Sequence, residues 1–170
     1  MQTEKSEPIR PFFSIILARS ENKVIGCEGK IPWDCPEDMQ YFKSLTTGHI
    51  CLSGYKTYLS MPENGLPDRK LYVLTSKKLK NKKSVFFIQS FEEFLDLTKN
   101  TTKEIFCIGG LAVYKIFIPF ASKIYLTEIK GIYEGDVFFD DNLLLGFKPK
   151  LLNETKTCKY YLYKREGVGR

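Results

Sequence analysis

The residues best suited to chemistry lie in residues 31–42, with the sequence IPWDCPEDMQYF. Pro36 favours a helix start, because the first helical position needs no N–H donor. Asp38 and Phe42 are four residues apart and would share a helix face, and Trp33, the only tryptophan, comes just before the helix. An acid held among large apolar groups has a raised pKa and can bind a flat, nitrogen-rich ligand. It could equally do no more than stabilise the helix dipole, and the spacing alone does not decide.

Three further candidates follow expected strands, at residues 53–57, 74–77 and 108–110. Open α/β sheets bind ligands at the carboxyl ends of their strands. Gly109 and Gly110 bring bare backbone to the start of a helix, which suits a phosphate group. Paired glycines more often serve a turn or close packing, so each segment alone is a weak signal. Together the three favour a dinucleotide lying across the sheet edge.

Arg69 and His49 are the remaining polar candidates. Arg69 follows a tight turn and could bind a carboxylate through two N–H donors, although an ordinary surface arginine is an open alternative. His49, the only histidine, fits the start of a strand. No Ser–His–Asp, Cys–His or metal-ligating arrangement can be built around it, so we expect no metal.

The composition indicates one compact domain, since the chain has 170 residues of which 43% are hydrophobic. We expect a flexible lead-in at 1–11, the domain at 12–166 and a tail at 167–170. The formal charge of +6 suggests affinity for anions, although the lysine-rich run 77–83 is best interpreted as a solvated loop. Five cysteines without CxxC spacing, and a polar start unlike a signal peptide, favour the reducing cytoplasm and exclude a zinc site.

The elements that must position these residues alternate between strand-like and helix-like patterns. Helices are expected at 36–45, 55–60, from the capping box at 90–93 to about 98, and at 111–117. The loop 24–33 precedes the first helix. The pattern predicts an α/β fold: a central, mainly parallel twisted sheet of about eight strands, an antiparallel C-terminal edge hairpin and about four flanking helices. Strands are expected at 12–18, 49–53, 70–75, 85–88, 104–108 and 123–128, with the hairpin at about 150–164.

Seven separate motifs resemble those of the dihydrofolate reductase family and follow one another in the family's order, over residues 14–165. One match could arise by chance, but seven in order could not. The resemblance implies hydride transfer from NADPH to C6 of 7,8-dihydrofolate while N5 gains a proton from water, giving 5,6,7,8-tetrahydrofolate for one-carbon metabolism and thymidylate synthesis. It also implies that antifolate inhibitors bind and that catalysis needs no nucleic acid. We expect no membrane span, because no apolar run is long enough, and take a monomer as the default. The motifs are 24–26, 31–38, 54–57, 66–69, 108–110, Tyr114 and 134–136.

The resemblance assigns the substrate side of the site. Asp38 would bind N3 and the 2-amino group of the pterin, supported by Thr127, with Trp33 as a third catalytic residue. Arg69 would hold the α-carboxylate of the glutamate tail. The other substrate-binding residues implied are Ile16, Leu17, Ala18, Met39, Phe42, Leu66 and Ile108.

The resemblance also assigns the cofactor side, with a cis peptide between Gly109 and Gly110. The backbone from 109 to 113 would lie under the pyrophosphate of NADPH, and the segments 54–57 and 74–77 at its adenosine and phosphate end. The cofactor-binding residues implied are Ala18, Ile25, Gly54, Tyr55, Lys56, Thr57, Leu74, Thr75, Ser76, Lys77, Gly109, Gly110, Leu111, Ala112, Val113 and Tyr114.

Two details refine this assignment. The loop 24–31 resembles the family's mobile lid, which Asp136 would hold closed. Tyr55 departs from the pattern, because the family usually has an arginine or lysine there to meet the 2′-phosphate. Lys56, Ser76 and Lys77 could replace that cation, so we expect NADPH to be preferred, but less strongly than usual.

Two other functions remain possible from the sequence. A pyrimidine reductase of riboflavin synthesis shares the sheet and the glycine pair, but it needs neither the arrangement around Asp38 nor the Arg69 clamp. A non-catalytic folate- or nucleotide-binding module is the other alternative, and Tyr55 is its only support.

Overall fold

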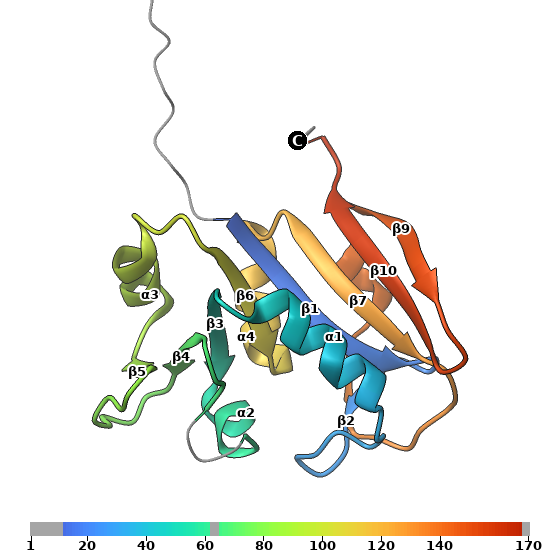
Figure 1. Cartoon of the computed structure of the whole chain (residues 1–170), viewed down its shortest axis with the longest axis horizontal. Coiled ribbons are helices and arrows are strands. Elements are labelled where there is room, and N and C mark those ends of the chain that lie inside the picture. The colour runs from blue at the N-terminus through green and yellow to red at the C-terminus, as the bar shows by residue number, and fades with distance from the viewer. Residues whose placement is uncertain (1–11, 62–64, 168–170) are drawn as a thin grey trace, which may run out of the picture.

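An eight-stranded twisted sheet forms the centre of the computed structural model, which describes residues 12–61 and 65–167 (Figure 1). The expected lead-in at 1–11 and all of the expected tail but Gly167 lie outside the described residues. The strand order is β5-β4-β3-β6-β1-β7-β10-β9, and every pair is parallel except β7–β10 and β10–β9. The predicted fold class is thereby confirmed. The strands are β1 Phe12–Ser20, β3 Ile50–Gly54, β4 Lys70–Leu74, β5 Val85–Ile88, β6 Glu104–Gly109, β7 Lys123–Ile129, β9 Phe147–Glu154 and β10 Cys158–Arg165.

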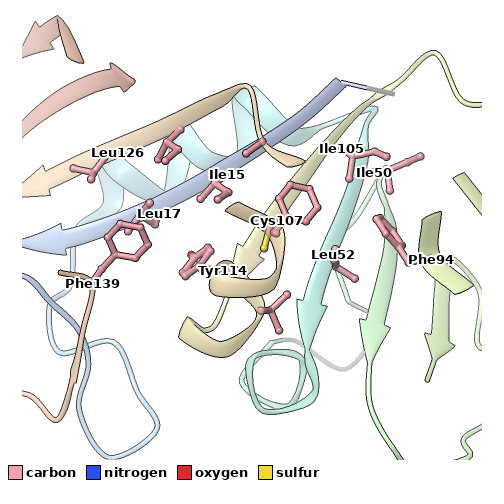
Figure 2. Close-up of a cluster of buried hydrophobic side chains, with 14 of the residues drawn as sticks. Ile15, Leu17, Ile50, Leu52, Phe94, Ile105, Cys107, Tyr114, Leu126 and Phe139 are labelled. Atoms are coloured by element: carbon pink, nitrogen blue, oxygen red, sulfur yellow. The ribbon is translucent and has the colours of Figure 1, made fainter. Parts of the chain in front are cut away.

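Helices cover both faces of this sheet. Helix α1 and helix α4 lie on opposite faces, as Figures 1 and 2 show from two sides. Among the described helices, none is both long and apolar enough to cross a bilayer. The helices are α1 Pro36–Thr46, α2 Tyr55–Leu59, α3 Phe91–Thr98 and α4 Leu111–Phe117, with short 3₁₀ turns η1 Ile118–Phe120 and η2 Asp141–Leu144.

The middle of strand β1, residues 15–18, is apolar because it is covered on both faces. Ile15 and Leu17 pack beneath α4 in the main core (Figure 2), whereas Ile16 points to the other face and packs with Phe42 of α1. This alternation follows from the two-residue period of a strand. The Leu17 side chain therefore belongs to the core on the α4 face, and only its backbone is available to a ligand beside α1.

The prediction of a loop at 24–33 is wrong in part, because residues 24–26 form a strand. Strand β2 (Val24–Gly26) pairs with β8 (Val137–Phe138), and Val24 is fully buried. A three-residue strand is too short to show an alternating pattern, and its partner lies more than a hundred residues away. The other expected elements agree within a few residues. The capping box of α3 differs in one bond: Ser90 accepts from the Glu93 N–H, but the Glu93 carboxylate accepts from Gln89.

Candidate active site

The three predicted strand-end segments lie side by side. Strands β4, β3 and β6 are neighbours and parallel, so their carboxyl ends meet at one edge of the sheet. The starts of α2 and α4 approach each other closely there. A Cβ atom built on Gly54 would lie 3.1 Å from Cγ2 of Val113, and one built on Gly110 would lie 3.6 Å from Oγ1 of Thr57. The sequence segments thus form one continuous backbone surface.

The glycine pair itself has the geometry that the resemblance implies. The Gly109–Gly110 peptide is cis, and Gly109 has φ +107°. A Cβ atom on Gly109 would lie 2.9 Å from Cζ and Oη of Tyr114. The Tyr114 side chain is buried and its hydroxyl donates to the Ile16 carbonyl at 3.0 Å. The strand end, helix α4 and strand β1 are therefore packed against one another with no space for a side chain at position 109.

Asp38 lies in the first turn of α1 and faces strand β7. The Thr127 side chain, which is almost fully buried, lies near its carboxyl group. Burial raises the pKa of Asp38, the neighbouring Thr127 hydroxyl lowers it, and the nearby Glu37 carboxylate raises it further. In the parallel β1–β7 pair, Thr127 lies opposite Ala18. A carboxyl group with a raised pKa is thus held beside the neighbouring strands β1 and β7.

Apolar side chains surround this carboxyl group on the α1 face. Phe42, Leu66 and Ile108 pack against the buried cluster that contains Ile16. Ala18 and Trp33 pack on a second cluster, and the Trp33 ring contacts Tyr133 edge-on with centroids 5.6 Å apart. Met39, expected as an apolar wall, is instead 60% exposed.

Arg69 is a buried residue rather than a surface one. Its side chain lies under the C-terminal end of α1: Nη1 donates to Oγ1 of Thr46 at 2.9 Å and Nε donates to the Pro67 carbonyl at 2.8 Å. Its guanidinium carbon lies 5.9 Å from the Phe42 ring centroid. Desolvation lowers the pKa of Arg69, but arginine stays charged in proteins. The structure thus fixes a cation beside the ring of Phe42.

The segment at the end of β4 brings a cation to Tyr55. The Lys77 ammonium lies 5.6 Å from the centroid of the Tyr55 ring, and the Lys77 N–H donates to Oγ1 of Thr75 at 3.1 Å. Lys56 is exposed on α2. The positive charge that the sequence lacks at position 55 is therefore present on a neighbouring segment.

The loop after β2 is fastened by Asp136. The Glu28 N–H lies 3.1 and 3.3 Å from the two carboxylate oxygens of Asp136, and the Asp136 N–H donates to the Gly26 carbonyl at 3.0 Å. Ile25, within β2, packs against the main core. In the described ranges 12–61 and 65–167, no cluster of histidine, cysteine or acidic side chains is arranged to hold a metal ion.

Sequence reasoning missed one cluster beside Asp38. The Glu37 carboxylate accepts hydrogen bonds from the hydroxyl groups of Thr155, Thr157 and Tyr160, on and beside β10. These partners are about 120 residues away in the sequence, and nothing local to Glu37 indicates them. A cavity of about 410 Å³ adjoins this cluster, between one face of α1 and the β9–β10 hairpin.

Comparisons with known proteins agree on one family. A family model described as dihydrofolate reductase matches residues 12–154. A dihydrofolate reductase of Staphylococcus haemolyticus is 33% identical over 160 residues, which are 91% of this chain and 95% of that protein. One from Haemophilus influenzae is 38% identical over 127 residues, 75% of this chain and 78% of that protein. A solved dihydrofolate reductase from Enterococcus faecalis, complexed with NADP(H) and RAB-propyl, superposes with a TM-score of 0.77 at 31% identity, over 91% of this chain and 96% of that one.

Proposed function

The chain belongs to the dihydrofolate reductase family, and on that premise we propose that it transfers a hydride from NADPH to 7,8-dihydrofolate. The product would be 5,6,7,8-tetrahydrofolate, the carrier used in one-carbon metabolism and thymidylate synthesis. The observation that carries the proposal is the Asp38 carboxyl, desolvated on the α1 face beside the Thr127 hydroxyl. Its two oxygens can accept two parallel N–H donors, which is what the amidine edge of a pterin offers.

The surroundings of Asp38 support a role beyond binding. Because burial raises its pKa, the carboxyl group takes up a proton more readily near neutral pH than an exposed aspartate would. The side chains of Ile16, Phe42 and Trp33 limit the water that can reach a ring lying there. Exclusion of water strengthens the electrostatic contacts of Asp38 and protects a transferring hydride. Asp38 would thus orient the pterin ring and favour its protonation.

The residues at the sheet edge fit NADPH, which would supply the hydride when bound. Gly54 and Gly109 let α2, α4 and the strand ends pack closely, and α4 begins just after Gly110, where its first backbone N–H groups could meet a pyrophosphate. The Lys77 ammonium over Tyr55 could meet the 2′-phosphate, which NADH lacks. We therefore infer a preference for NADPH that depends on Lys77 instead of a residue at position 55.

The remaining assignments extend the same proposal. Arg69 would hold the glutamate tail of the substrate, and antifolates would bind where dihydrofolate does. All five cysteines are free thiols, which supports the reducing cytoplasm as the location. We propose a monomer built on residues 12–166, which light scattering after gel filtration would test directly.

The test of the proposed function is the loss of NADPH absorbance when 7,8-dihydrofolate is added, with tetrahydrofolate identified as the product. A ribosylated pyrimidine phosphate offered in place of dihydrofolate should cause no loss. Activity with that substrate alone would support the pyrimidine reductase, and binding of both ligands without turnover would support the binding module. Either result would overturn the proposal.

A further inference from the structure

Helix α1 carries Asp38, yet few of its own residues anchor it in the core. Thr46, at the C-terminal end, is the only residue of α1 that is buried. At the other end Cys35 contributes no side-chain cap, but it is buried and its Sγ lies 3.4 Å from Sγ of Cys158 on β10. The residue before the helix is therefore attached to the sheet, and the turn that carries Asp38 needs an attachment of its own.

Glu37 supplies that attachment. Its Oε1 accepts from the Tyr160 hydroxyl at 2.6 Å and from the Thr155 hydroxyl at 2.9 Å, and Oε2 accepts from Thr157 at 2.5 Å. Hydrogen bonds from these hydroxyl groups hold the pKa of Glu37 below its usual value, so it is ionised at neutral pH. Hydrogen bonds to a charged acceptor are about twice as strong as neutral ones. Three such bonds tie a single helical turn to strand β10 and the turn before it.

The strands that hold Glu37 also hold the partner of Asp38. Tyr160 on β10 lies opposite Thr127 on β7, and the Thr127 hydroxyl is near enough to Asp38 to lower its pKa. The ring of Tyr160 also packs on Tyr41, one turn further along α1, with centroids 4.5 Å apart. Two adjacent acids of α1 therefore lie beside two directly paired residues of the sheet, and any shift at Glu37 changes the geometry at Asp38.

We propose that Glu37 is a positioning residue for the reduction of dihydrofolate: by holding the first turn of α1 on Tyr160, Thr155 and Thr157, it keeps Asp38 beside Thr127, where it can bind the pterin ring. This inference rests on the proposed function. Glu37 lies beside the substrate side of the site, away from the glycine pair, so it acts on dihydrofolate and leaves the binding of NADPH unchanged.

The charge of Glu37 has a second effect on the same residue. Tyr41, Tyr114 and Tyr160 are the other titratable groups near Asp38 on α1, α4 and β10, and each has a raised pKa, so all three are neutral at pH 7. Glu37 is the ionised neighbour that raises the pKa of Asp38. Removing its charge therefore lowers the pKa of Asp38, while removing only a hydroxyl partner does not.

Two variants separate these effects. Glu37→Gln keeps the shape of the side chain and removes its charge, whereas Tyr160→Phe removes one bond and leaves the charge. We expect kcat/KM for dihydrofolate to fall about tenfold in each, because small misplacements at a reacting centre are costly. KM for NADPH should stay within twofold of the unaltered protein. The apparent pKa of the pH–rate profile should fall in Glu37→Gln only, which a merely structural role would not produce.

The matched control is Glu92→Gln, an exposed acid in the first turn of α3, which should leave all of these values unchanged. Thermal unfolding checks that each variant folds, and Tyr160→Phe provides the test should Glu37→Gln fail to fold. Unchanged dihydrofolate kinetics in the folded variants, or equal changes in KM for both ligands, would overturn the inference. Lack of activity in the unaltered protein would instead overturn the proposed function.

Discussion

Replacing Gly109 by alanine is a sharp test of the packing at the proposed cofactor edge. The residue has φ +107°, and the added Cβ would lie 2.9 Å from two atoms of the buried Tyr114 side chain. Placing an L side chain at positive φ costs about 1–2 kcal/mol. Forcing an extra methyl group into a filled space costs about 1–3 kcal/mol more. The variant should therefore lose roughly 2–5 kcal/mol of unfolding free energy.

Gly48→Ala is the matched control for this variant. Gly48 also has a positive φ, +85°, but a Cβ atom there would have no neighbour within 4 Å. It should lose only the backbone cost of about 1–2 kcal/mol. For a domain of this size each kcal/mol lowers Tm by about 2–4 °C, so we expect Tm to fall by about 4–20 °C for Gly109→Ala and about 2–8 °C for Gly48→Ala.

Calorimetry measures the Tm of both variants, and steady-state kinetics measure their KM for NADPH. Displacing Tyr114 disturbs its hydrogen bond to Ile16, so KM for NADPH should rise in Gly109→Ala and stay unchanged in Gly48→Ala. Equal Tm values for the two variants would refute the reasoning, because they would show that Tyr114 does not fill the space beside position 109.

Three further predictions concern charge. Lys77→Met should raise KM for NADPH by about ten- to a hundredfold, because one charge-assisted contact is lost, and should leave KM for NADH unchanged. The control is Lys83→Met, in the same lysine run, which should alter neither KM. Asp136→Asn should slow single-turnover hydride transfer about fivefold by weakening the hold on the Glu28 N–H, and a rate equal to that of the unaltered protein would contradict this role. Because burial raises the pKa of Asp38 in the folded protein, its carboxyl group ionises more readily when the chain is unfolded. The free energy of unfolding therefore falls as the pH rises from about 4, the pKa of an exposed aspartate, through the higher pKa of the folded protein. Asp38→Asn should therefore unfold at a higher temperature than the unaltered protein at pH 7, with the difference vanishing below about pH 3.

Local patterns carried most of the fold prediction. The apolar strand at 12–18, the helix after Pro36 and the glycine pair after 108 are each visible in a few consecutive residues, because burial and backbone freedom act at that scale. The sequence offers Lys56, Ser76 and Lys77 as replacements for the cation missing at position 55, and the Lys77 ammonium lies 5.6 Å from the centroid of the Tyr55 ring, so we propose Lys77 among the three.

Contacts between distant segments could not be predicted in this way. The hydrogen bonds of Glu37 depend on where the β9–β10 hairpin returns beside β7, and the β2–β8 pair depends on a register between short segments more than a hundred residues apart. Nor did the sequence show that Arg69 is buried against Thr46. These features arise from the assembled sheet, which no local pattern encodes.

The central claim is that Asp38 and its contact with Thr127 make this chain a dihydrofolate reductase. Single-turnover hydride transfer from NADPH to dihydrofolate at pH 7 tests it most directly, in the unaltered protein and in Asp38→Asn. We predict rapid transfer in the former and a loss of roughly a hundredfold or more in the latter, with the fold intact by circular dichroism. A rate in Asp38→Asn within about threefold of the unaltered protein would contradict the assignment.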